Sequence, residues 1–199
     1  MRIELRFNLI SLKKPLGPVD NPQDILEFWF SDEVRPRHFK STPEFDQQIK
    51  TRFMSAWQQA RSGGLDSWLG SREGCLALVI ILDQFPLNMF RDQPQGYSTE
   101  QHSREVANHA IRAGFDEQLP ADQRAFLYLP FMHSESLSDQ DYSVALFEAA
   151  GMQESLKWAK HHREIVRQFG RFPHRNTVLG RQSSKEELSY LESDQAFHG

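Results

Sequence analysis

Three polar clusters interrupt the apolar and amphipathic segments of the sequence, and their residue types could do chemistry. The first comprises Asp83, Gln84, Asn88 and Arg91, at the end of the most hydrophobic run of the chain and just beyond it. A carboxylate in such a place is partly desolvated and needs a cation or several hydrogen bonds to stay charged. We therefore expect Asp83 to be buried and bonded to an arginine of the third cluster, as a structural tie or as part of a site.

The second cluster, residues 130–135, ends a hydrophobic helix and contains His133 and Glu135. These side chains could form a base with its orienting carboxylate, or they could ligate a metal ion. Zinc deaminases also place a glutamate two residues after a histidine, but their paired cysteines are excluded because the chain has one cysteine, Cys75. The structural alternative is that His133 caps the end of one helix and Glu135 caps the start of the next.

The third cluster is the richest in cations. Between residues 163 and 181 the chain has five arginines, no lysine and one acidic residue, Glu164. Arginine in place of lysine favours planar, bidentate contacts with carboxylates or phosphates. The partners are either Asp83 and Glu135 within the fold or the groups of a ligand, and the two alternatives are compatible. The candidate residues of this cluster are His162, Arg163, Arg171, His174, Arg175, Asn176 and Arg181.

The turn around Pro173 gives the sharpest expectation. The proline stiffens the turn, so its side chains lose less entropy on binding than those of a flexible loop. We expect Arg171, His174 and Arg175 to form an anion site together with His133.

Several catalytic motifs are absent from the sequence: the Gly-rich phosphate loop, Gly-x-Ser-x-Gly, His-Glu-x-x-His and Gly-x-Gly-x-x-Gly. Their absence argues against P-loop nucleotide hydrolysis, serine hydrolysis on an α/β fold and the commonest kind of zinc proteolysis. A mononuclear site of His133, Glu135 and either His162 or His174 has suitable ligands for a divalent metal, but its spacing is not diagnostic. We assign no metal and expect no cofactor.

The segments that must position these clusters have a helical period. Helices are predicted over residues 24–30, 43–62, 71–85, 99–113, 121–129, 138–150 and 153–169, with a last helix starting at Ser184. Pro86 and Pro130 are expected to end the two helices that precede them. This pattern predicts an all-α fold, an array of antiparallel helix pairs, with an N-terminal arm over residues 1–22 and a single helical domain over residues 23–199.

Composition narrows the class of protein. The net charge is 23 − 27 = −4, which argues against a protein that works mainly on nucleic acid or anionic membranes. The longest apolar run, residues 75–82, is too short to cross a bilayer, and no targeting segment is evident. A single cysteine cannot form an internal disulfide, so a reducing compartment, the cytoplasm, is expected.

The motifs at the three clusters resemble a known bacterial family, domain of unknown function 924. The resemblance rests on Leu82-Asp83-Gln84-Phe85-Pro86, on Pro130-Phe131-Met132-His133-Ser134-Glu135, on Phe169-Gly170-Arg171-Phe172-Pro173-His174-Arg175-Asn176 and on Leu179-Gly180-Arg181. It extends over about residues 23–191, and one departure is Leu87, where the family usually has arginine. The resemblance implies a right-handed, tetratricopeptide-repeat-like array of helices, and it implies no established activity.

Two classes of function remain open. The first is a small-molecule protein that binds an anionic metabolite where the three clusters meet, either without catalysis or as an enzyme with His133, Glu135 and His174 as its catalytic groups. The second is a helical-repeat scaffold that binds a partner peptide in a concave groove. An enclosed pocket walled by histidine and arginine favours the first class, and an open apolar groove favours the second.

Overall fold

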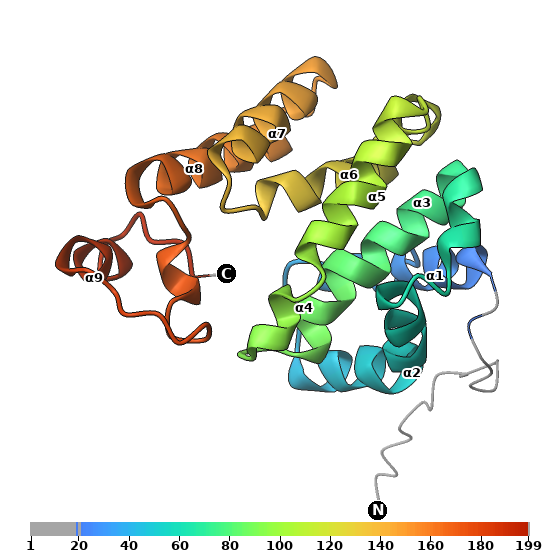
Figure 1. The fold of residues 1–199 in the computed structure, drawn as a ribbon, viewed down its shortest axis with the longest axis horizontal. Helices are drawn as coiled ribbons and strands as arrows, with labels where there is room; N and C mark the ends of the chain where they lie inside the picture. Colours follow the sequence, from blue (N-terminus) through green and yellow to red (C-terminus); the bar gives the residue numbers. More distant parts are fainter. Residues whose placement is uncertain (1–18, 20, 199) are drawn as a thin grey trace, which may run out of the picture.

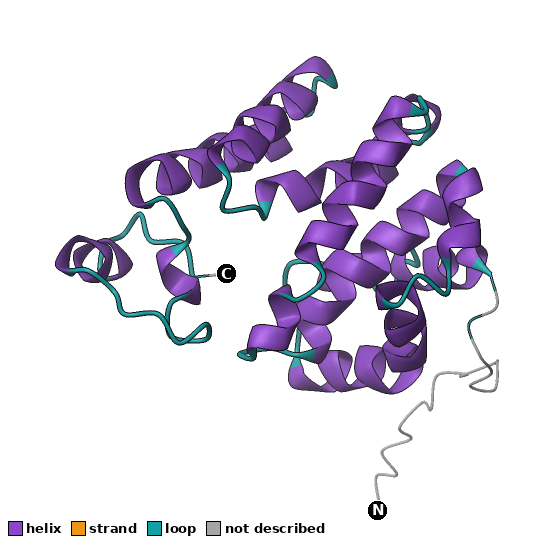
Figure 2. Cartoon of the chain, viewed as in Figure 1, coloured by secondary structure: helices purple, strands orange, loops and turns teal. Residues whose placement is uncertain are grey.

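The structure is a computed structural model of the 199-residue chain, and it describes residue 19 and residues 21–198. The expected N-terminal arm therefore lies outside the described residues, apart from Val19, Asn21 and Pro22. Figure 2 shows that the described part of the chain consists of helices joined by loops. The predicted all-α class is confirmed, whereas the right-handed repeat-like array remains an expectation.

The helices follow one another with short connections. The α-helices are α1 (Pro22–Trp29), α2 (Pro43–Arg61), α3 (Arg72–Val79), α4 (Phe85–Met89), α5 (Glu100–Arg112), α6 (Ala121–Met132), α7 (Leu137–Ala149), α8 (Gln153–Phe169) and α9 (Lys185–Leu191). A π-helical segment, η3 (Ile80–Gln84), joins α3 to α4. The 3₁₀ segments are η1 (Arg35–Arg37), η2 (Asp66–Gly70), η4 (Pro94–Tyr97), η5 (Asp116–Gln118) and η6 (Pro173–Arg175).

Local capping explains where several helices begin and end. The side chains of Thr42 and Ser71 accept hydrogen bonds from the first turns of α2 and α3, as their positions in the sequence predict. Ser184 and Glu187 form the predicted capping box at the start of α9. Gly170 ends α8 with a φ of 70°, a left-handed conformation that favours glycine.

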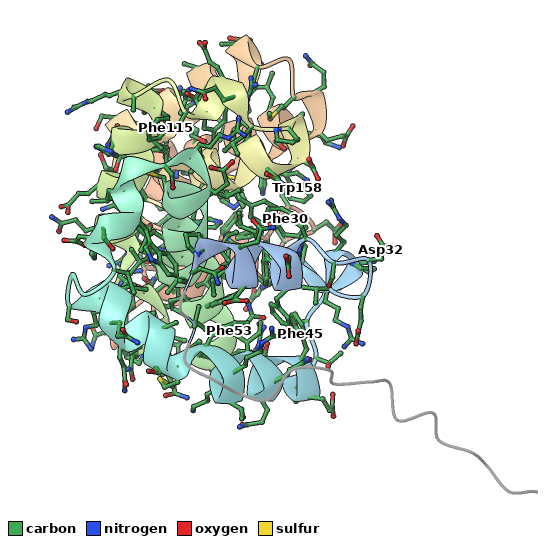
Figure 3. All side chains as sticks on the ribbon, turned by 90° about the vertical axis from the view of Figure 1, so that its right-hand side faces the viewer. Phe30, Asp32, Phe45, Phe53, Phe115 and Trp158 are labelled. Atoms are coloured by element: carbon green, nitrogen blue, oxygen red, sulfur yellow. The ribbon has the colours of Figure 1, made fainter. Side chains whose placement is uncertain are left out.

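The apolar faces of these helices meet in one main core. Its largest fully buried side chains include Trp29, Trp57, Phe53, Phe85 and Phe147. The helix α3 packs against α1, α5 and α6, and α4 packs against α2. Figure 3 shows Phe45 and Phe53 on α2, below α1 in that view. A smaller core of Ile165, Val166 and Phe172 belongs to the C-terminal part of the chain.

The C-terminal part continues from this core. The helix α6 packs against α5, and α7 packs against both α6 and α8. In Figure 1 the segment from η6 to α9 lies beside the end of the molecule where α4 and α5 meet. Among the described residues, no helix has both the length and the apolar character needed to span a membrane.

Two prolines do not end their helices, contrary to the prediction. The helical run that starts at Arg72 passes through Pro86 to Met89, and α6 passes through Pro130 to Met132. Before Pro86 the backbone widens into the π-helical turn, in which the Phe85 N–H donates to the Ile80 carbonyl. Proline has no N–H for the carbonyl four residues before it. For Pro86 that carbonyl belongs to Leu82, which instead accepts a hydrogen bond of 2.6 Å from the Thr99 hydroxyl.

The Thr99 hydroxyl is therefore predicted to stabilise the helical run through Pro86. It is buried, and it also accepts a bond of 3.4 Å from the Trp57 indole N–H. Thr99→Val keeps the shape but leaves both buried groups without a partner, which should lower the free energy of unfolding by about 1–3 kcal/mol. Urea denaturation measures the loss. Thr51→Val, at an exposed threonine of α2, is the control and should cost less than about 0.5 kcal/mol; an equal effect of both variants would disprove this role of Thr99.

Candidate functional site

A carboxylate–histidine pair joins the first and second clusters. Asp83 lies in the π-helical segment and is only 2% exposed, and His133 is the C-terminal cap of α6. The Nδ1 atom of His133 lies 3.0 Å from Oδ2 and 3.1 Å from Oδ1 of Asp83. His133 keeps 19% of its side chain exposed, and no described residue hydrogen-bonds to its Nε2 atom. One ring nitrogen is thus held by the protein, and the other is available.

The electrostatics of the pair favour a charged histidine. Burial lowers the pKa of His133, but the charge and hydrogen bond of Asp83, together with the charge of Glu100, outweigh it and raise the pKa above its ordinary value. The Gln84 amide donates a 2.6 Å hydrogen bond to Oδ2 of Asp83. Asn88 does not reach Asp83, since its amide donates to the Gln84 carbonyl at 2.9 Å. These bonds fix the Asp83 carboxylate toward the imidazole.

The prediction that Asp83 bonds to an arginine of the third cluster is wrong. The nearby arginines have other carboxylates as partners. The Nη1 atom of Arg175 lies 3.0 Å from Oε1 of Glu100, at the start of α5, and Arg181 pairs with Glu135. Asp83 therefore pairs with His133, because the arginines are engaged by Glu100 and Glu135.

Arg175 has an unusual environment for a cation. Its side chain is 7% exposed and lies between two aromatic rings, 4.6 Å from the ring centre of Tyr97 and 4.7 Å from that of Phe172. Its Nε atom is buried without a hydrogen-bond partner. Burial raises the pKa of its partner Glu100, and the charge of Arg175 opposes that rise. Arg175 is therefore a buried cation whose Nε–H donor has no hydrogen-bond partner among the described residues.

Glu135 is turned away from His133. Its carboxylate accepts hydrogen bonds of 2.7 Å and 2.9 Å from the two terminal nitrogens of Arg181, and one of 2.8 Å from the Phe172 backbone N–H. Burial raises the pKa of Glu135, but the hydrogen bonds from Arg181 and Phe172 and the charges of Arg181 and Arg175 together outweigh it, and the pKa lies below its ordinary value. Glu135 thus neither orients His133 nor caps α7, and its contacts tie the start of η6 to the end of α6.

The expected anion site of Arg171, His174, Arg175 and His133 is not assembled as a whole. Arg171 forms bonds of 2.6 Å and 2.8 Å with Glu187, the capping residue of α9, and among the described residues it makes no hydrogen bond or ion pair with Asp83 or His133. Of the arginines in the turn, Arg175 alone acts on the pKa of His133 through its charge. The structure therefore brings His133 and Arg175 into one neighbourhood and separates Arg171 from it.

The other two candidate histidines, His162 and His174, are held in neutral form. Burial lowers the pKa of His162 to about 3 and that of His174 to about 3. His162 is bonded through Nδ1 to the Trp158 carbonyl at 2.9 Å, and Nδ1 of His174 is buried without a partner. A catalytic acid–base role for His174 requires a pKa much nearer neutrality, so the structure does not support one.

Three further residues that were predicted for the site have other protein residues as partners: Arg91, Arg163 and Asn176. Arg91 pairs with Asp46 at 2.6 Å. Arg163 lies 3.5 Å from Asp141. Asn176 is buried and donates to the Ser183 hydroxyl at 3.0 Å, while its Oδ1 atom has no partner.

Metal binding finds no support in the described part of the chain. It contains no group of three or more His, Cys, Asp or Glu side chains that could hold a metal ion. The open alternative of a His133–Glu135 metal site fails because Glu135 is engaged by Arg181. Cys75 is buried, and burial raises the pKa of its thiol to about 11, so it is not a reactive thiolate.

Two hollows on the described surface do not include Asp83, His133 or Arg175. One has a volume of about 460 Å³ between the start of α2 and the end of α4, and another has about 520 Å³ between α1 and the start of α6. Both are open, and polar residues outnumber apolar ones in the lining of each. Asn88 and Arg91 of the first cluster line the first hollow.

Two residues of the neighbourhood were missed by the sequence analysis. Tyr97 lies shortly before the polar helix α5, and Glu100 is the first residue of that helix. Neither residue follows an apolar segment of the kind that precedes the three clusters. Glu100 looks like an ordinary acidic residue of a first helical turn. No local signal identifies it, because its role comes from a contact with Arg175, 75 residues along the chain.

Comparisons with known proteins agree on a family and give no activity. A solved structure of a protein of unknown function, ATU0120 from Agrobacterium tumefaciens, superposes with a TM-score of 0.82; the two chains are 40% identical, and the match covers 86% of this chain and 96% of that one. No curated protein matches the chain. Residues 25–195 match the family described as a bacterial protein of unknown function, DUF924. The chain, with its Asp83–His133 pair and its buried arginine, belongs to the DUF924 family.

Proposed function

We propose that this DUF924 protein is an enzyme of the acid–base type, in which His133 exchanges a proton with a small anionic molecule. The observation that carries the proposal is the pairing of one His133 nitrogen with the buried Asp83 carboxylate, while the other nitrogen has no hydrogen-bond partner among the described residues. A carboxylate that accepts from Nδ1 fixes the ring and its tautomer, and it leaves Nε2 to take or give a proton.

The raised pKa of His133 suits this role. A general acid or base works best when its pKa lies near the pH at which the protein operates. Burial alone would make His133 a weak base, as it does for His162 and His174. His133 is the one of these three histidines whose pKa is raised, and the Asp83 carboxylate is the main cause of that rise.

The charges around His133 admit an anionic ligand when His133 is protonated. The carboxylates of Asp83, Glu100 and Glu135 face the cations Arg175 and Arg181, so the net charge of these groups is 2 − 3 = −1 with a neutral His133 and 0 with a protonated one. An incoming anion is therefore repelled less when His133 takes up a proton. Arg175 supports this assignment because its buried Nε donor is unfilled, and an unfilled buried donor is costly.

The scaffold alternative has less support. It calls for an open apolar groove, and neither of the two hollows described above is lined mainly by apolar residues. We also infer a reducing compartment such as the cytoplasm, because the one cysteine is buried and unpaired.

The pKa of His133 tests the role of Asp83. Histidine titration by NMR should give His133 a pKa above about 6.5 in the wild-type chain. Asp83→Asn removes the charge that opposes desolvation, so the pKa should fall below its ordinary value. Asp116→Asn is the matched control, a buried aspartate bonded to Tyr128 instead, and should leave the value unchanged. A pKa of His133 that does not respond to Asp83→Asn would contradict the proposal.

Anion binding is tested with inorganic phosphate. Phosphate should raise the free energy of unfolding, by about 2.7 kcal/mol at 100 times its Kd. The effect should grow as the pH falls through the raised pKa of His133, since protonation adds a cation to the site.

A double variant assigns the phosphate effect to Arg175. Glu100→Gln with Arg175→Gln removes both members of a buried pair and leaves no unpaired charge, and it should abolish the effect. The control removes the exposed pair of Arg35 and Asp122 in the same way and should keep it. No stabilisation of the wild type, or equal stabilisation of both double variants, would count against the site.

A further inference from the structure

The C-terminal segment places one aromatic side chain into a group of rings beside the proposed site. The ring centre of Phe197 lies 4.4 Å from that of His162 and 5.1 Å from that of His174. Trp158 lies at 6.5 Å from it and is half exposed, so it borders the group on the solvent side. The fully buried Phe172 closes the inner side, at 5.5 Å from His162. We call Trp158, His162, Phe172 and His174 the ring pocket.

The chemistry of this ring pocket suits a flat apolar group. Both imidazoles are uncharged near neutral pH, because burial lowers their pKa values to about 3. The Nδ1 atom of His174 is buried and has no hydrogen-bond partner, so the wall has one unfilled polar position. Stacked or edge-on aromatic contacts at such distances are favourable without any charge.

Phe197 is held there by few other contacts. Its backbone N–H donates one hydrogen bond of 2.9 Å, to the Tyr190 hydroxyl at the end of α9. The side chain is only half-buried, and no helix follows α9 among the described residues. Displacing Phe197 would therefore disturb little of the fold, in contrast to displacing Phe172.

The ring pocket adjoins the proposed site through consecutive residues. His174 precedes Arg175, and the Arg175 guanidinium stacks on Phe172. The charge of His133 acts on the pKa of His162, and those of Arg175, Glu135 and Arg181 act on the pKa of His174. His198, on the C-terminal segment itself, also acts on the pKa of His174 and lowers it. A molecule held by Arg175 could thus extend a ring into the pocket.

We infer that the ring pocket is a binding subsite for a planar apolar ring, and that the chain's own Phe197 fills it when no ligand is bound. The substrate class that follows is a small molecule with an aromatic ring next to an anionic group. The expectation that this molecule has an anionic group rests on the proposed function, whereas the expectation that it has an aromatic ring does not. Phe197 acts as an internal competitor. The apparent affinity for a ligand therefore equals the intrinsic affinity multiplied by the fraction of time that Phe197 is out of the pocket.

Three probes test the anionic group and the aromatic ring separately. Methylphosphonate has the anionic group alone, benzyl alcohol has the ring alone, and phenylphosphonate has both. Their affinities for the full chain are measured by NMR titration in the wild type, in Phe197→Ala and in the control Phe39→Ala. Phe39 is 78% exposed and belongs to another part of the surface. Phe197→Ala should bind the two ring-bearing probes about 10-fold or more tightly than the wild type does, with methylphosphonate unchanged.

The outcomes distinguish the two proposals. If Phe197→Ala and the wild type bind both ring-bearing probes equally, the ring pocket is overturned. If benzyl alcohol gains affinity while neither phosphonate binds any variant, the subsite stands and the anion site of the proposed function fails. In Phe197→Ala, the pKa values of His162 and His174 should also rise from about 3 toward the ordinary value as solvent enters. If Phe197→Ala does not fold, a chain ending at Gln195 replaces it.

Discussion

The Asp83 carboxylate lies in the apolar interior, and its charge has to be balanced there. The chain provides that balance from His133, 50 residues along, and from the neighbouring amide of Gln84. The pair therefore fixes the end of α6 against the π-helical segment. A π-helical turn is an uncommon feature that often occurs at functional sites, and here it presents the carboxylate to the imidazole.

The two arginine–carboxylate pairs complete the arrangement. Glu100 with Arg175 and Glu135 with Arg181 attach the η6 segment to α5 and to the end of α6. Both arginines donate to carboxylates within a partly or fully buried environment, which suits the guanidinium better than the ammonium of lysine. This is consistent with the use of arginine at positions 175 and 181. Among the described residues, Nε of Arg175 and Nε of Arg181 are both buried without a hydrogen-bond partner, and Arg175 is the one whose charge acts on His133.

The sequence was sufficient for the features that depend on local chemistry. The helical class, the caps at Thr42, Ser71 and Ser184, and the burial of Asp83 all follow from neighbouring residues. The predicted breaks at Pro86 and Pro130 were wrong, because a hydroxyl from another helix and a π-helical turn compensate for the missing donor at Pro86.

The partners across the fold could not be predicted from local patterns. Opposite charges made an arginine the natural partner for Asp83, yet a histidine occupies that position because the arginines find Glu100 and Glu135. Glu100 has no signal in the sequence, since only the tertiary fold brings it to Arg175. The convergence of Asp83 and His133 was expected in outline, whereas the separate binding of Arg171 to Glu187 was not.

The central claim is that Asp83 holds His133 so that Nε2 is the reactive nitrogen. Long-range ¹H–¹⁵N correlation spectra of the full chain with labelled histidine test it directly, because they show which nitrogen carries the proton. Above the pKa of His133, the account predicts a neutral ring with its proton on Nδ1 and an unprotonated Nε2. A neutral ring that carries its proton on Nε2 would contradict the claim, since Nδ1 could then not donate to Asp83.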